Sequence, residues 1–150
     1  MEILKDLVQK EILLRLQNKL ENLNFLIDTT TESRDMDLKS SVGDKHETSR
    51  AKIQNDLDHY YSQLMILESQ INILNKINLS INYNKVAQGA LIETNKGIFF
   101  ISTGIGKMVI ENKIIFAVSM ISPIGMAMKG MRELQSFNFN NISYTINKIS

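Results

Sequence analysis

Apolar residues recur every three or four positions along residues 2–38, and again along residues 45–78. In the first stretch a 4-3-4 spacing joins Leu16, Leu20, Leu23 and Ile27, and a drifting continuation includes Ile3, Leu7, Ile12 and Leu13. In the second stretch, steps of four and three join Ile53, Leu57, Tyr60, Leu64, Leu67, Ile71 and Leu74. Such heptad spacing puts one apolar stripe on each of two helices. Two helices of about 35 residues joined by a short turn pack antiparallel, which predicts a coiled-coil hairpin about 50 Å long.

The predicted hairpin reverses near residues 40–43, where Gly43 tolerates the backbone angles of a tight turn. Asp44 then stands where a helix cap is expected, and Glu47 occupies the third helical position, as in a capping box. Residues at i and i+3 share a helical face. The sequence therefore predicts two acids side by side at the tip of the hairpin, with helix capping as the plainer interpretation of both.

The pattern changes after Leu79, where short apolar runs alternate with Asn, Gly and Ser. Strands are expected at residues 86–93, 98–102, 108–110, 114–119, 137–139 and 142–148. Ser122, Pro123 and Gly130 frame one helix of about two turns, since Ser caps, Pro starts and Gly ends helices. The fold class predicted is α+β: a helical hairpin domain over residues 1–79, then a small, mostly antiparallel β domain over residues 80–150.

Composition narrows the classes of function. The chain is 43% apolar and 22% charged, which is typical of a folded domain, and it contains no Cys. Disulfides, thiolate zinc sites and thiol nucleophiles are therefore excluded. The N-terminus carries no apolar run of signal-peptide length and no segment approaches the roughly 20 apolar residues of a membrane span. We expect a cytoplasmic protein that does not enter a membrane.

Two short motifs, in this order and with the heptads between them, resemble the Gre family of transcript-cleavage factors. The first is Gly43-Asp44-x-x-Glu47, and the second is Ser122-Pro123-Ile124-Gly125-x-Ala127-x-x-Gly130. The resemblance covers nearly the whole chain in architecture and implies bacterial RNA polymerase as the partner. It implies that the hairpin enters the secondary channel of the polymerase and that an FKBP-like C-terminal domain docks outside. Ser122, Pro123, Ile124 and Gly125 would belong to that docking surface.

The resemblance also implies a role for the tip. Asp44 and Glu47 would help to hold the second catalytic Mg²⁺ of the polymerase and its attacking water, so that the polymerase cuts backtracked RNA. This chemistry suits Mg²⁺, which prefers carboxylate oxygens and keeps several waters. Two carboxylates complete such a site but do not build one, so we expect no metal or cofactor in the free protein and no catalysis by the chain alone. A channel-entering factor is expected to be a monomer.

Three alternatives stay open. Lys45, His46 and Arg50 bring positive charge to the tip, which favours a regulator or inhibitor that occupies the channel without cleavage. A hairpin with exposed apolar edges also suits a coiled-coil adaptor that does not bind polymerase. A prolyl isomerase is the third alternative, by analogy with FKBP-like domains, whose pockets are lined by aromatic residues. The aromatic residues available for such a pocket are Phe99, Phe100, Phe116 and Tyr144.

Overall fold

The structure, a computed structural model, describes the backbone of residues 2–39 and 44–150, and the side chains of residues 4–36 and 47–150. The predicted turn at residues 40–43 lies outside the described residues. The chain divides into two compact units. The hairpin unit is Leu14–Ile71, and the sheet unit combines Met1–Leu13 with Asn72–Ser150. The division into domains at residues 79 and 80 stays a prediction.

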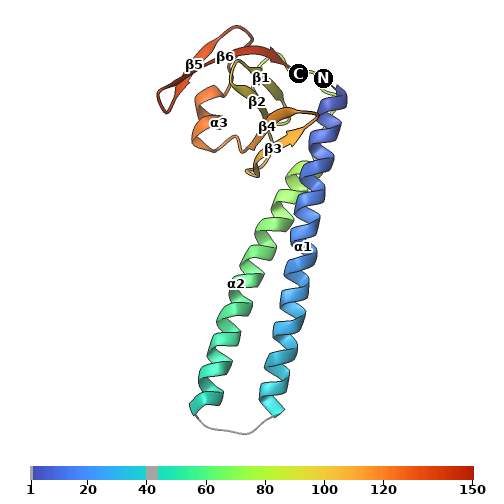
Figure 1. The fold of residues 1–150 in the computed structure, drawn as a ribbon, viewed down its shortest axis with the longest axis vertical. Coiled ribbons are helices and arrows are strands. Elements are labelled where there is room, and N and C mark those ends of the chain that lie inside the picture. Colours follow the sequence, from blue (N-terminus) through green and yellow to red (C-terminus); the bar gives the residue numbers. More distant parts are fainter. Residues whose placement is uncertain (1, 40–43) are drawn as a thin grey trace. The chain divides into compact units, whose positions relative to one another are not determined.

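Two long helices supply the hairpin unit, α1 (Glu2–Lys39) and α2 (Asp44–Asn75). Within this unit they run side by side in opposite directions (Figure 1). Within this unit, every buried side chain that the structure describes belongs to the predicted heptads. The buried members are Leu16, Leu23, Ile27, Leu57 and Leu67, and the half-buried members are Leu20, Ile53, Tyr60, Leu64 and Ile71. The two apolar stripes form one seam, as the spacing predicts.

The first turns of α1 differ from the sequence-based expectation. The buried residues there are Leu4, Val8 and Ile12, in steps of four, whereas Leu7 and Leu13 are only half-buried. Four residues turn a helix through slightly more than one full turn, so a run of such steps rotates the buried face around the axis. This part of α1 belongs to the sheet unit. Its apolar stripe therefore has a different packing partner from the heptad stripe of the hairpin unit.

The sheet unit contains six strands and one short helix. In chain order these are β1 (Leu91–Thr94), β2 (Gly97–Ile101), β3 (Gly106–Ile110), β4 (Lys113–Val118), α3 (Pro123–Met128), β5 (Ser136–Phe139) and β6 (Ile142–Ile149). The sheet order is β3-β4-β2-β1-β6-β5. All neighbours pair antiparallel except β2 and β4, which are parallel. The predicted fold class is confirmed: two long helices precede a mostly antiparallel sheet with one short helix.

Local chemistry explains the tight turns of the sheet. Asn140 and Asn141 connect β5 to β6 with φ values of 50° and 63°, the left-handed angles that a two-residue hairpin turn requires and that Asn tolerates.

The first predicted strand was too long: β1 begins at Leu91, and residues 86–90 are not a strand. The amide of Val86 instead donates to the carbonyl of Met131 at 2.8 Å, and Gly89 has a φ of +93° that interrupts an extended strand.

Alternate strand residues face opposite sides of the sheet, and both sides are buried. One side contributes Ile92, Phe99 and Ile101 to a core that includes Met128 of α3. The remaining buried apolar side chains described in the sheet unit come from the sheet (Leu91, Ile98, Phe100, Met108, Ile115, Ala117) and from the helices (Leu4, Val8, Ile12, Leu74). We infer that the start of α1 and the end of α2 cover the second side, since a buried face needs a cover.

A buried lysine ties the start of α1 to the segment before β1. The side chain of Lys5 is 1% exposed. Its Nζ donates to the carbonyl of Ile81 at 3.2 Å and lies 4.9 Å from the ring centroid of Tyr83. A second long-range bond, from Gln9 Nε2 to the carbonyl of Leu74 at 2.8 Å, joins the two helices. A buried ammonium group requires such partners.

Candidate functional site

The two tip acids lie in the first turn of α2. Asp44 is the first residue of the helix and Glu47 follows three residues later, so both occupy one face at its N-terminus. The side chain of Glu47 is exposed, whereas that of Asp44 lies outside the described part of the chain. The amides of a first helical turn lack intrahelical partners and favour negative charge nearby. The sequence-predicted pair therefore shares one short stretch of helix, and its role stays a prediction.

The described side chains offer no ready-made metal cage. Within residues 4–36 and 47–150, no three His, Asp or Glu residues gather in a way that could hold an ion. His59 lies on α2, where its Nε2 pairs with Gln63 Nε2 at 3.0 Å.

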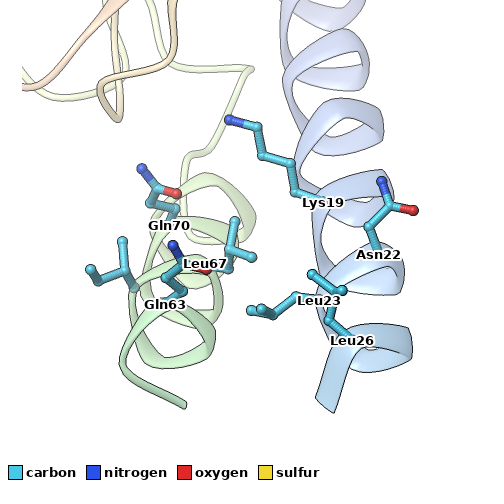
Figure 2. A pocket seen from close by; sticks show the side chains of 8 residues that line it. Lys19, Asn22, Leu23, Leu26, Gln63, Leu67 and Gln70 are labelled. Carbon is cyan, nitrogen blue, oxygen red and sulfur yellow. The ribbon is translucent and has the colours of Figure 1, made fainter. Parts of the chain in front are cut away.

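A shallow groove follows one flank of the hairpin unit (Figure 2). It measures about 380 Å³ and is lined by Lys19, Asn22, Leu23 and Leu26 of α1 and by Gln63, Ile66, Leu67 and Gln70 of α2. Figure 2 shows Leu23 and Leu67 directed into the space between the arms, with Lys19 reaching across from α1. The lining also fixes which levels of the two arms face each other: residues 19–26 lie opposite residues 63–70.

The second predicted site, Ser122 to Gly125, forms the start of α3. Ser122 is the N-cap: its Oγ accepts a bond from the Gly125 amide at 3.1 Å and donates to the Ser119 carbonyl at 2.6 Å. Pro123 takes the first helical position, where its missing amide hydrogen costs nothing. Gly125 packs so closely that a Cβ would lie 2.2 Å from the Ser119 carbonyl oxygen. Ser122, Pro123 and Gly125 thus each have a structural role at the start of α3, whatever the motif binds.

We expect Ser122→Ala to lower the free energy of unfolding by about 1–2 kcal/mol, because it removes the N-cap and leaves the Gly125 amide without its side-chain acceptor. Urea denaturation followed by near-UV circular dichroism measures this change. Ser122→Thr keeps the hydroxyl and serves as the control. An alanine variant as stable as the parent protein would contradict the capping role.

Apolar side chains surround this cap on the surface. Ile121 is 86% exposed and Met126 57% exposed, with Pro123 exposed between them. Beside them lies a hollow of about 490 Å³ lined by Ile73, Lys76, Ile77, Asn78, Ile81, Tyr83, Gln88, Ser102, Ser119, Met120 and Ile121. No sequence motif indicates this hollow, because its walls come from four separate stretches of the chain. The one local signal is Met120-Ile121, two apolar residues in a turn just before Ser122-Pro123.

The long helices do not have membrane character: in the stretches that the structure describes, none is apolar enough over its length to cross a bilayer.

Comparisons with known proteins find similarity among solved structures and not among protein families. No protein-family model matches the chain, and no curated protein matches it. Among solved structures, the transcription factor Gfh1 is similar at 16% identity and a TM-score of 0.36, over 91% of this chain and 92% of that one. Gfh1 of Thermus aquaticus is similar at 16% identity and a TM-score of 0.30, over 90% and 91% of the two chains.

Proposed function

We propose that this chain is a Gre-like transcription factor that binds bacterial RNA polymerase and acts through its secondary channel on backtracked RNA. The observation that carries the proposal is the position of the two tip acids. Asp44 and Glu47 stand in the first turn of α2, at the end of a two-helix hairpin that an apolar seam holds together. A narrow pair of helices that ends in carboxylates suits entry into a pore that leads to a metal site.

The length and continuity of the helices suit a factor that enters a deep channel. α1 is continuous over 38 residues, which corresponds to about 57 Å at the usual rise of an α-helix. Neither helix contains Pro, the residue that most often breaks or kinks one. Two long, continuous helices can carry carboxylates into a narrow pore, and metal-assisted cleavage requires such groups to be placed at the metal.

In this proposal the polymerase supplies the catalytic metal and the RNA, and the chain supplies oxygen ligands. The carboxylates of Asp44 and Glu47 would complete the coordination of a weakly held Mg²⁺ and orient its attacking water. The apolar surface around Ser122–Gly125 would dock on the outside of the enzyme. The chain would cleave nothing alone, and it would act as a monomer.

Charge next to the acids favours a second candidate of the same class. Arg50, one turn after Glu47, is exposed, and Lys45 and His46 stand between the acids in sequence. Positive charges within a few ångströms oppose the binding of a cation. This favours a factor that occupies the channel and slows or inhibits the polymerase without cleavage.

The test uses a stalled, backtracked elongation complex and measures shortening of the RNA 3′ end. We expect the intact chain to stimulate shortening, and Asp44→Asn or Glu47→Gln to reduce the rate about 100-fold, the scale of removing a positioned group from a metal site. Glu68→Gln is the matched control, because Glu68 is an exposed acid on the same helix far from the tip. The control should cleave as the parent chain does.

The outcomes separate the candidates. Polymerase binding with unchanged RNA length supports the non-cleaving regulator. An absence of polymerase binding ends both candidates and leaves the coiled-coil adaptor, which light scattering across protein concentrations would then detect as a self-associating species.

A further inference from the structure

The apolar seam of the hairpin unit gives way to polar residues after Ile27 on α1 and before Ile53 on α2. Residues 28–35 of α1 read Asp-Thr-Thr-Thr-Glu-Ser-Arg-Asp, and residues 47–52 of α2 read Glu-Thr-Ser-Arg-Ala-Lys, so Ala51 is the single apolar residue in both stretches. Ile27 and Leu57 are buried, whereas Thr30 and Arg34, the next seam positions on α1, are only half-buried. We call residues 28–35 and 47–52 together the distal segment, and the seam between Leu16 and Ile27 with its partners on α2 the shaft.

A polar hollow replaces side-chain packing between the arms of the distal segment. It measures about 300 Å³ and is lined by Thr29, Thr30, Ser33, Ser49, Lys52, Ile53 and Asp56. At roughly 30 Å³ per molecule this volume has room for several waters among polar groups. The groove in the shaft is of similar size but is lined by Leu23, Leu26, Ile66 and Leu67, whereas Ile53 is the one apolar residue that lines this hollow. Dispersion and apolar burial therefore contribute little to the closure of the arms here.

Three hydroxyl groups of α1 in this region donate to carbonyls of the same helix. Thr29 Oγ1 donates to the carbonyl of Phe25 at 3.0 Å, Thr31 Oγ1 to that of Ile27 at 2.7 Å, and Ser33 Oγ to that of Thr29 at 3.1 Å. Arg34 pairs at 3.6 Å with its neighbour Asp35. Bonds from Ser and Thr to the carbonyl four residues earlier slightly weaken and often bend a helix. These interactions lie within α1 and do not join it to α2.

The helices of the distal segment also have little stability of their own. Three successive Thr residues have lower helix propensity than Leu, Lys or Glu, and isolated helices shorter than about 12 residues are marginal in water. Helix there depends on continuity with the shaft.

From these observations we infer that the distal segment opens as a separate local unit while the shaft stays closed. The inference concerns the free protein and does not depend on the proposed function. It gives the hairpin a region, at the level of Thr29–Ser33 and Ser49–Ile53, in which the two arms can separate without loss of the seam in the shaft. Local unfolding of this kind draws on regions with few buried apolar contacts.

Native-state hydrogen exchange of the full chain tests the inference. The amides of residues 30–35 and 49–52 should exchange at least about 100-fold faster than those of residues 16–27 and 57–71, since low-stability units open far more often than a packed core. Their exchange should depend little on added urea, because a small opening exposes little surface, and both arms should share one opening free energy. Exchange of the distal segment together with the shaft, or unrelated values on the two arms, would overturn the inference.

A pair of double variants separates arm opening from simple helix fraying. Thr30→Leu with Ser49→Leu places apolar side chains on both walls of the hollow and should slow exchange on both arms at least tenfold. Thr30→Ala with Ser49→Ala removes the same hydroxyls and has the higher intrinsic helix propensity, but it adds almost no packing. If the two double variants protect the amides equally, helix propensity alone limits opening and the proposed separation of the arms is wrong.

Discussion

Removing one heptad from each arm, residues 20–26 of α1 and 63–69 of α2, is expected to abolish RNA shortening while the chain stays folded and still binds polymerase. The two deletions lie at one level of the hairpin, since residues 19–26 face residues 63–70 across the groove. Each deletion keeps the heptad phase, so the seam can re-form. Seven residues shorten a helix by about 10 Å. In metal-assisted chemistry an error of about 1 Å in placement can already cost 100-fold in rate.

The control keeps the length and changes the sequence. Replacing the same two heptads by unrelated ones that retain apolar residues at positions 20, 23, 64 and 67 should leave the shortening rate close to that of the parent chain. Circular dichroism and a polymerase pull-down check that both variants fold and bind. If the shortened chain cleaves as well as the full-length chain, the tip acids do not act by reaching a fixed site, and the proposed mechanism is wrong.

Gly125→Ala is expected to lower the free energy of unfolding by about 3 kcal/mol, the upper end of the usual cost of forcing a methyl group into a packed site. The new Cβ would lie 2.2 Å from the carbonyl oxygen of Ser119 and 2.8 Å from that of Met120. Both neighbours are backbone atoms, which cannot move aside as a flexible side chain can. The Ser119 carbonyl also accepts from the amide and hydroxyl of Ser122, so displacing it disrupts the cap of α3.

Gly104→Ala provides the matched control for this variant. No atom lies within 4 Å of the position that its Cβ would take, so the change should fall within about 0.5 kcal/mol of the parent chain. Urea denaturation with near-UV circular dichroism compares the two variants. Equal stability of the two alanine variants would show that α3 can shift away from Ser119 at little cost, contrary to the close packing described above.

Much of the fold was open to prediction because its signals are local. The heptad positions from Ile53 to Leu74 needed only regular spacing, and Ser122-Pro123 needed only the preferences of a helix start. The Asn140-Asn141 turn likewise follows from the angles that Asn tolerates. Each of these signals depends on residues within one or two turns of each other.

What escaped prediction depends on partners distant in sequence. The burial of Leu4 and Val8 follows from their place in the sheet unit, and periodicity within α1 could not reveal it. The parallel pairing of β2 with β4 skips the intervening strand β3. The residues of β2 and β4 do not by themselves identify the strand with which each one pairs. Of the candidate sites, the acids at 44 and 47 and the cap at Ser122 were visible as motifs. The hollow beside Ile121 was not, because no single stretch carries its shape.

The burial of Lys5 gives this chain an internal chemical reporter. Reagents that acylate amines need access to the nitrogen, so Lys5 should resist labelling while the exposed Lys76 and Lys85 react. Its modification rate relative to that of Lys76 and Lys85, read by mass spectrometry, would then report how readily the opening turns of α1 detach from the carbonyl of Ile81 and the ring of Tyr83. An ordinary lysine footprint thus measures the anchoring of the long helix without any engineered probe.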